Sequence, residues 1–234
     1  RLDRPGREGR AQHQGHAEQL SGPEPSLVIL DYGMGNRRSV EKACEKVGAR
    51  TTVSADEKAI READGIILPG VGAFPRAMSR IHELGLDEML RSAEAAGQPI
   101  LGICLGYQLL FESSVELGGS DGLGLLPGKV VEIPAQGRKI PHIGWAAVTW
   151  TQPSPLTDGM RPGEPFYFVH SFVPAPEDAD TLGTASYGGE FACVAGRGRT
   201  FGAQFHPEKS STAGLKMLRN FVEICADPEK AEVG

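Results

Sequence analysis

The residues best suited to chemistry are a cysteine between two glycines, in the segment Gly102-Ile103-Cys104-Leu105-Gly106. This is the pattern of a nucleophile elbow, G-x-S-x-G, with cysteine in place of serine. An abrupt strand-to-helix turn strains the backbone of the nucleophile, and flanking glycines remove side chains that would clash there. The helix N-terminus would favour the thiolate, and the amide of Leu105 would face a developing oxyanion. The alternative is a buried structural cysteine between two packing glycines.

A cysteine nucleophile needs a base, and the base needs a group that orients it. The segment Gln204-Phe205-His206-Pro207-Glu208 offers both. Residues two apart in an extended chain point to the same side, and Pro207 biases His206 towards the extended region. Glu208 could therefore hold one imidazole nitrogen while the other faces Cys104. Taken alone, the motif also fits a surface His-Glu pair in a loop.

A third segment, Leu68-Pro69-Gly70-Val71-Gly72-Ala73-Phe74, follows an apolar run and precedes a helical pattern. Glycines at such a turn let a backbone N–H approach a ligand closely, which suits a second oxyanion donor. No Lys-Ser/Thr pair follows, so the segment is not a phosphate loop. A plain strand–helix turn is the alternative.

Short apolar runs that alternate with helical patterns must position these motifs. The predicted strands of the first half are residues 27–30, 51–53, 65–68 and 99–103. The predicted helices are residues 39–47, 74–84 and 86–95, with another that begins near Leu105. This alternation predicts an α/β fold with a mostly parallel sheet, whose ligand sites lie at the carboxyl ends of the strands.

The second half changes character and predicts closely spaced strands that would add to the sheet in antiparallel fashion. These predicted strands are residues 129–133, 147–150, 166–169, 181–186, 192–194 and 200–205, and a last helix covers residues 212–225. Residues 1–25 contain few large apolar side chains, so we expect a disordered extension there. Residues 26–234 are expected to form a single domain.

Composition excludes several classes of protein. A hydrophobic fraction of 40%, a charged fraction of 23% and a net charge of -6 are typical of a globular protein and argue against a nucleic-acid or anionic-membrane surface. The four cysteines form no CxxC pair, and no group has metal-ligand spacing, so we expect neither a metal nor an organic cofactor. Free thiols without an apolar leader favour the cytoplasm. The cysteines other than Cys104 are expected to be buried structural residues.

Taken together, the PGVG loop, the stretch Gly102–Glu112 and the stretch Phe205–Ser210 resemble the class I, triad-type glutamine amidotransferases. Three further segments resemble the glutaminase subunits of imidazole glycerol phosphate synthase within that class. They are Asp31–Asn36, Pro141–Trp145 and Phe168–Phe172. The similarity runs from about Leu27 to Cys225, and six motifs in this order are strongly specific.

The resemblance implies a flavodoxin-like three-layer sandwich and a role for each residue. Cys104 would attack the glutamine amide, His206 would protonate the departing ammonia and then activate water, and Glu208 would orient His206. Val71, Gly72 and Leu105 match the oxyanion hole. The positions that hold glutamine in the family correspond here to Gly72, Gln108, Glu116, His170, Ser171 and Phe172.

The resemblance also implies a partner, a (β/α)8-barrel cyclase that uses the ammonia to convert the ribonucleotide PRFAR to imidazole glycerol phosphate and AICAR. The partner-facing positions correspond to Asn36, Lys139, Pro141, His142 and Trp145. From the residues alone, His142 could equally be a polar loop histidine with its hydrogen bonds satisfied, and Trp145 could be a core aromatic. Two residues depart from the family pattern, which usually has Asn where Ala146 stands and Leu where Arg37 stands. Both departures bear on the expected interface and neither touches the triad.

Three other functions fit parts of this pattern. The nearest is the glutaminase of another triad amidotransferase, serving guanylate, anthranilate or pyridoxal phosphate synthesis. A non-catalytic binding module is disfavoured because Cys104, His206 and Glu208 are all present. A cysteine peptidase or esterase is disfavoured because Gln108 and Glu116 suit a small amino-acid substrate.

Overall fold

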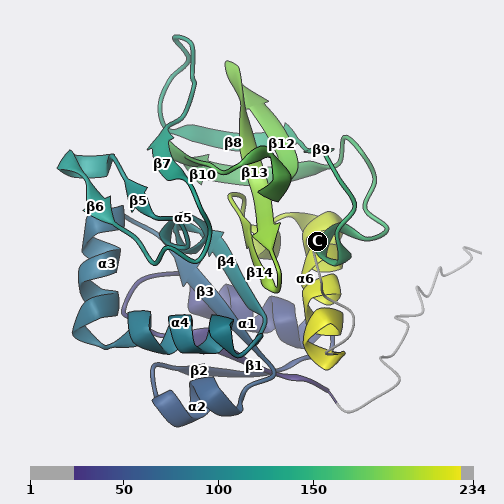
Figure 1. Ribbon diagram of the computed structural model, residues 1–234. Helices are drawn as coiled ribbons and strands as arrows, with labels where there is room; N and C mark the ends of the chain where they lie inside the picture. The colour runs from purple at the N-terminus through teal and green to yellow at the C-terminus, as the bar shows by residue number, and fades with distance from the viewer. Residues whose placement is uncertain (1–23, 228–234) are drawn as a thin grey trace, which may run out of the picture.

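The computed structural model describes residues 24–227, and an eight-stranded sheet runs through its centre (Figure 1). The strand order is β2-β1-β3-β4-β14-β13-β12-β9, and the first five strands are parallel. These five are β1 (Ser26–Leu30), β2 (Arg50–Ser54), β3 (Gly65–Gly70), β4 (Ile100–Cys104) and β14 (Thr200–Ala203). Their order is that of a flavodoxin-like sheet, with its switch point between β1 and β3.

Antiparallel strands extend this sheet, and two smaller sheets, one of them mixed, lie towards the top of the view in Figure 1. The extension consists of β13 (Gly189–Arg197), β12 (Thr181–Tyr187) and β9 (Thr149–Trp150). One small sheet pairs β8 (His142–Ala147) with β10 (Pro165–His170). The other has the order β11 (Phe172–Ala175), β7 (Lys129–Glu132), β5 (Ser113–Ser114) and β6 (Ser120–Asp121).

Helices cover both faces of the sheet because its parallel strands are apolar on both sides. Along β1, Leu27 and Ile29 join the core formed with α1 (Arg37–Lys46) and α6 (Ser211–Ala226). Val28 and Leu30 join the opposite core. That core includes side chains of α2 (Glu57–Glu62), α3 (Phe74–Glu83), α4 (Leu86–Ala95) and α5 (Leu105–Leu109). The result is a three-layer sandwich.

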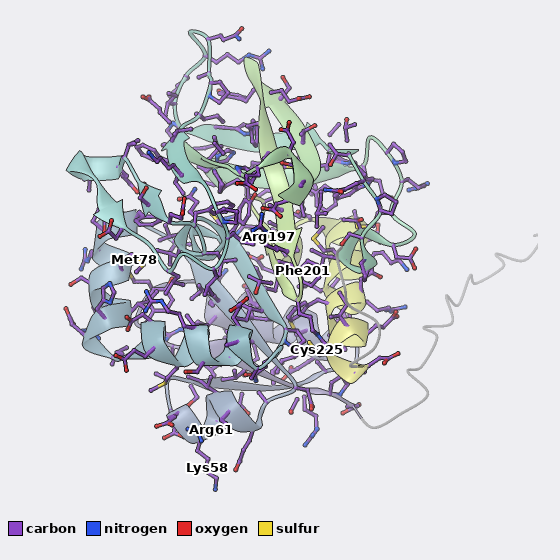
Figure 2. All side chains as sticks on the ribbon, in the orientation of Figure 1. Lys58, Arg61, Met78, Arg197, Phe201 and Cys225 are labelled. Atoms are coloured by element: carbon purple, nitrogen blue, oxygen red, sulfur yellow. The ribbon has the colours of Figure 1, made fainter. Side chains whose placement is uncertain are left out.

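Side-chain positions follow these layers (Figure 2). Met78 of α3 and Cys225 of α6 are buried in the opposite cores, whereas Lys58 and Arg61 of α2 extend into solvent at the lower edge of the view. Four 3-10 helices complete the described chain. They are η1 (Glu116–Gly118), η2 (Pro155–Thr157), η3 (Asp178–Asp180) and η4 (Pro207–Lys209).

The structure confirms the predicted α/β class and corrects several elements. Residues 200–205 were predicted as an antiparallel addition; β14 does pair antiparallel with β13, but it runs parallel to its other neighbour, β4. Residues 129–133 and 166–169 lie in the small sheets, and the predicted strand 147–150 is split at the buried Val148. Helix α2 was not predicted; its N-cap Asp56 accepts a hydrogen bond from the Ala59 amide.

The extension predicted at residues 1–25 falls, apart from its last two residues, outside the described part of the chain. The Pro25 carbonyl already accepts a hydrogen bond from the Arg50 amide at 2.9 Å, which attaches that residue to the edge of the sheet. Within residues 24–227, no helix is both long enough and apolar enough to span a membrane.

Candidate active site

Cys104 occupies a strained turn between β4 and α5. It has φ 56° and ψ -110°, a conformation that non-glycine residues adopt at a cost of about 1–3 kcal/mol. The flanking glycines are required sterically. A Cβ on Gly106 would lie 1.7 Å from the Leu68 carbonyl oxygen, and one on Gly102 would lie 2.7 Å from the Gly106 oxygen. The strand therefore turns into the helix as an elbow, although α5 spans only Leu105–Leu109.

His206 and Glu208 follow β14, the strand next to β4, so they reach the same rim of the sheet as Cys104. The Nδ1 atom of His206 lies 3.0 Å from Oε1 of Glu208, and both side chains are buried. The His206 amide donates to the Tyr167 carbonyl, and Ser210 Oγ donates to the His206 carbonyl. These bonds hold the histidine backbone against β10.

The electrostatics of His206 favour the imidazolium. Burial alone would lower its pKa, but hydrogen bonds and charge interactions with Cys104 and Glu208 outweigh burial and raise the pKa to about 9. Because Nδ1 of His206 is hydrogen-bonded to Glu208, it is Nε2 of His206 that interacts with Cys104. Cys104, His206 and Glu208 thus lie in the arrangement that a nucleophile, a base and a group that orients the base would need.

A cavity of about 300 Å³ opens in front of Cys104. Every residue predicted for the oxyanion hole and for glutamine lines it: Val71, Gly72, Leu105, Gln108, Glu116, His170, Ser171 and Phe172. The structure adds Val169 and Lys209, to which the sequence analysis gave no role, and Pro141 from the predicted interface. This volume is at the lower end of the range for small-molecule cavities and suits an amino acid.

The two segments predicted to form an oxyanion hole meet at the ends of neighbouring strands. Gly70 pairs with Cys104 in the register of β3 and β4. Val71 and Leu105 are the next residues after these two strands. Gly72 has φ +103°, which is readily adopted only by glycine. This arrangement brings the PGVG loop next to Cys104.

Hydrogen bonds fix the two polar residues expected to hold glutamine. Nε2 of Gln108 donates to the Phe172 carbonyl at 2.9 Å and to Oε1 of Gln204 at 3.0 Å. Oε2 of Glu116 accepts from the Phe74 amide at 2.8 Å, at the start of α3. Both side chains are therefore held in place on the cavity wall before any substrate enters.

His170 and His142 form a buried pair behind the cavity. Nδ1 of His170 lies 3.0 Å from the Phe172 carbonyl oxygen, and its Nε2 lies 3.1 Å from Nδ1 of His142. Burial lowers the pKa of His170 to about 3, against the raising effect of the Phe172 carbonyl, so it is neutral. The carbonyl requires a proton on Nδ1 of His170. Nε2 of the neutral His170 then carries no proton and accepts a hydrogen bond, so Nδ1 of His142 donates to it.

The predicted interface residues divide between surface and interior. Asn36, Lys139, Pro141 and Trp145 are exposed, and Trp145 retains 54% of its accessible surface. His142 was expected to face the partner, but β8 turns its ring inward, where it stacks on Tyr187 with ring centroids 4.2 Å apart. The correction follows from strand alternation, which was not foreseen because Pro141–Trp145 was not predicted to be a strand.

The two departures from the family pattern have local explanations. Arg37 forms an ion pair with Asp31 across the loop after β1. Ala146 lies next to Trp145 on β8 but is partly buried against the core, so it points away from the exposed side of the strand.

Other features of the described chain are structural. Cys44, Cys193 and Cys225 are buried and unpaired, which confirms their prediction as structural residues. A cavity of about 800 Å³ lies between residues 150–162 and α6, but no cysteine or histidine lines it. Among residues 24–227, no group of three or more His, Cys, Asp or Glu side chains could hold a metal ion.

Comparisons with known proteins agree with this geometry. The family model for class-I glutamine amidotransferases matches residues 28–225. Solved structures of similar fold include a glutamine amidotransferase, with a TM-score of 0.69 at 19% identity over 86% of this chain and 99% of that one. Another is PurLQS from Thermotoga maritima, with a TM-score of 0.67 at 22% identity over 86% of this chain and 98% of that one. The fold and the site therefore define a class-I glutamine amidotransferase, an enzyme with glutaminase activity.

Curated relatives narrow the class. The chain is 49% identical over 199 residues to the imidazole glycerol phosphate synthase subunit HisH of Moorella thermoacetica, covering 85% of this chain and 94% of that protein. It is 46% identical over 203 residues to the HisH subunit of Methanosarcina barkeri, covering 85% and 98%. The chain belongs to the HisH family, the glutaminase subunits of imidazole glycerol phosphate synthase in histidine biosynthesis.

Proposed function

We propose that Cys104, His206 and Glu208 hydrolyse glutamine in the 300 Å³ cavity and that the ammonia passes to a cyclase barrel docked over its mouth. The observation that carries the proposal is the triad itself. A strained cysteine, a buried histidine with a raised pKa and a carboxylate 3.0 Å from that histidine meet at the wall of one small cavity.

The geometry supports a two-step mechanism. The Cys104 thiolate attacks the side-chain amide carbon of glutamine, and the amides of Val71 and Leu105 stabilise the oxyanion. The imidazolium of His206 protonates the amide nitrogen, the C–N bond breaks and ammonia leaves behind a glutamyl thioester. His206, now neutral, removes a proton from water, the hydroxide attacks the thioester and the thiolate departs with glutamate as the product.

The surface around the cavity supports docking of a partner. Seven large hydrophobic side chains are exposed among residues 24–227. Six of them lie at or near the cavity. Val71 lines it, and Val115, Leu117 and Ile140 are sequence neighbours of residues that line it. Ile143 and Trp145 lie on β8, and Leu84 is the exception. Large apolar side chains exposed around the mouth of a cavity favour an interaction site there.

The test measures glutamate release from glutamine by the chain alone and with a cyclase barrel and its nucleotide ligand. We expect strong stimulation by the liganded barrel, and loss of at least about a thousandfold in Cys104→Ala because the covalent route disappears. Cys225→Ala, which removes a buried thiol on α6, is the matched control and should retain activity. Glutamate production by Cys104→Ala would refute the nucleophile assignment, and an unstimulated wild type would refute the partner.

A further inference from the structure

Gln204 has a buried amide that is aimed at the proposed nucleophile. Its side chain is completely buried on the segment between β14 and His206. The Oε1 atom accepts a hydrogen bond from Gln108 Nε2 at 3.0 Å, and this bond fixes which end of the amide faces the sulfur. The Nε2 atom consequently points at Cys104 Sγ, at 3.9 Å. None of the roles described above uses this contact.

The other neighbours of Sγ give this contact its importance. The Val169 carbonyl oxygen lies 3.7 Å from Sγ, and a carbonyl can only accept, so it favours the protonated thiol. The amide of Gln204 can donate to the thiolate and opposes that preference. The titratable groups that interact with Cys104 are His206 and Tyr32, and Glu116 and Lys209 stand on the same cavity wall.

We propose that Gln204 is a further functional residue of the glutaminase reaction, a hydrogen-bond donor that stabilises the Cys104 thiolate. The inference rests on the proposed role of Cys104 as the nucleophile. The thiolate carries a full charge before attack and again when it leaves the thioester, whereas the thioester sulfur is neutral and a weak acceptor. A donor at this position therefore assists formation of the nucleophile and its departure in the second step.

The experiment measures the rate at which iodoacetamide alkylates Cys104 in the full chain as a function of pH, because only the thiolate reacts. Loss of glutaminase activity tracks the modification, and Cys104 is the only one of the four cysteines that lines the cavity. In Gln204→Met, which is of similar length but cannot donate, the midpoint of the alkylation profile should rise by about one pH unit. The value of kcat should fall about tenfold.

Gln204→Glu separates the two bonds of the amide. An oxygen still accepts from Gln108, but the group that faces the sulfur is no longer an amide donor, so the midpoint should again rise. If Gln204→Met does not fold, an unchanged midpoint in this variant of the same shape overturns the inference, because a buried carboxylate raises the midpoint by its charge as well as by the loss of the donor. The matched control is Gln98→Met. This substitution also removes two side-chain hydrogen bonds, from Gln98 to the carbonyls of Ile60 and Ala63, but it should leave the alkylation midpoint of Cys104 unchanged.

A purely structural role would give a different result. If Gln204 served only to hold Gln108 for substrate binding, KM would rise while the alkylation midpoint stayed at the wild-type pH, and the inference would be overturned. If the wild-type protein remained active after alkylation of Cys104, the assignment of Cys104 as the nucleophile would fail, and the inference would fail with it. An unchanged midpoint alongside inactivation by alkylation at Cys104 overturns the inference alone.

Discussion

Acid should destabilise this protein through His170. The pKa of His170 is about 3 in the folded chain, because of burial first and then of the nearby His142 and His206, against 6.5 for an ordinary histidine. Between these two values the unfolded chain binds a proton that the folded chain does not. The stability from this difference is fully present above pH 6.5 and is lost progressively as the pH falls towards 3.

The size of the effect follows from linkage. One proton changes the free energy of unfolding by about 1.4 kcal/mol per pH unit, so lowering the pH from 6.5 to 5 should cost about 2 kcal/mol through His170 alone. The assay is urea denaturation of wild type and His170→Gln at both pH values. The packing cost of the substitution is common to both pH values and cancels in the difference. We expect the variant to lose about 2 kcal/mol less than wild type on acidification.

His206 confines this test to acid and neutral pH. His206 acts with the opposite sign, because its pKa is raised to about 9, so its contribution is present below pH 6.5 and is lost as the pH rises through 9. If His170→Gln lost as much stability on acidification as wild type, the neutral buried pair would be refuted.

Two other predictions concern the elbow and the partner surface. Gly106→Ala places a Cβ 1.7 Å from the Leu68 carbonyl oxygen, so thermal unfolding should show that the free energy of unfolding falls by more than about 3 kcal/mol. Gly85→Ala has open space around the new Cβ at φ +65°, so its free energy of unfolding should fall by only about 1 kcal/mol. Equal losses in the two variants would contradict the steric argument. Trp145→Ala should weaken binding to the cyclase barrel more than about tenfold in calorimetry, because large exposed aromatics dominate interfaces. Leu84→Ala is its control, and equal effects of the two would refute the proposed docking face.

The parallel half of the fold was predictable because its signals are local. The apolar runs of β1, β3 and β4 are buried on both faces, so each reads as a continuous hydrophobic segment ended by a turn. The convergence of Cys104 and His206 then follows from topology, since neighbouring parallel strands end at the same rim. The triad could therefore be expected from motifs in the right order.

The small sheets could not be predicted in the same way. The residues of β8 alternate between buried and exposed, as in His142 and Ile143, but a glycine and a preceding proline weaken the strand pattern. Which sheet a strand joins depends on pairing between residues far apart in sequence, as with Trp145 and Tyr167. The inward position of His142 and the contact of Gln204 with Cys104 arise from that long-range packing.

The polar groups behind the cavity satisfy one another and cannot be treated as independent. Gln204 bonds to Gln108, Gln108 and His170 share the carbonyl of Phe172, and His170 bonds to His142. All four side chains are buried, so each loses a partner that water cannot replace if a neighbour is changed. The effects of single substitutions here should therefore not add, and double-mutant cycles are needed to apportion them. A catalytic loss at one of these positions reveals its own role only when its neighbours keep their bonds, which is why a variant that changes only the end of Gln204 facing Cys104 is more informative than its removal.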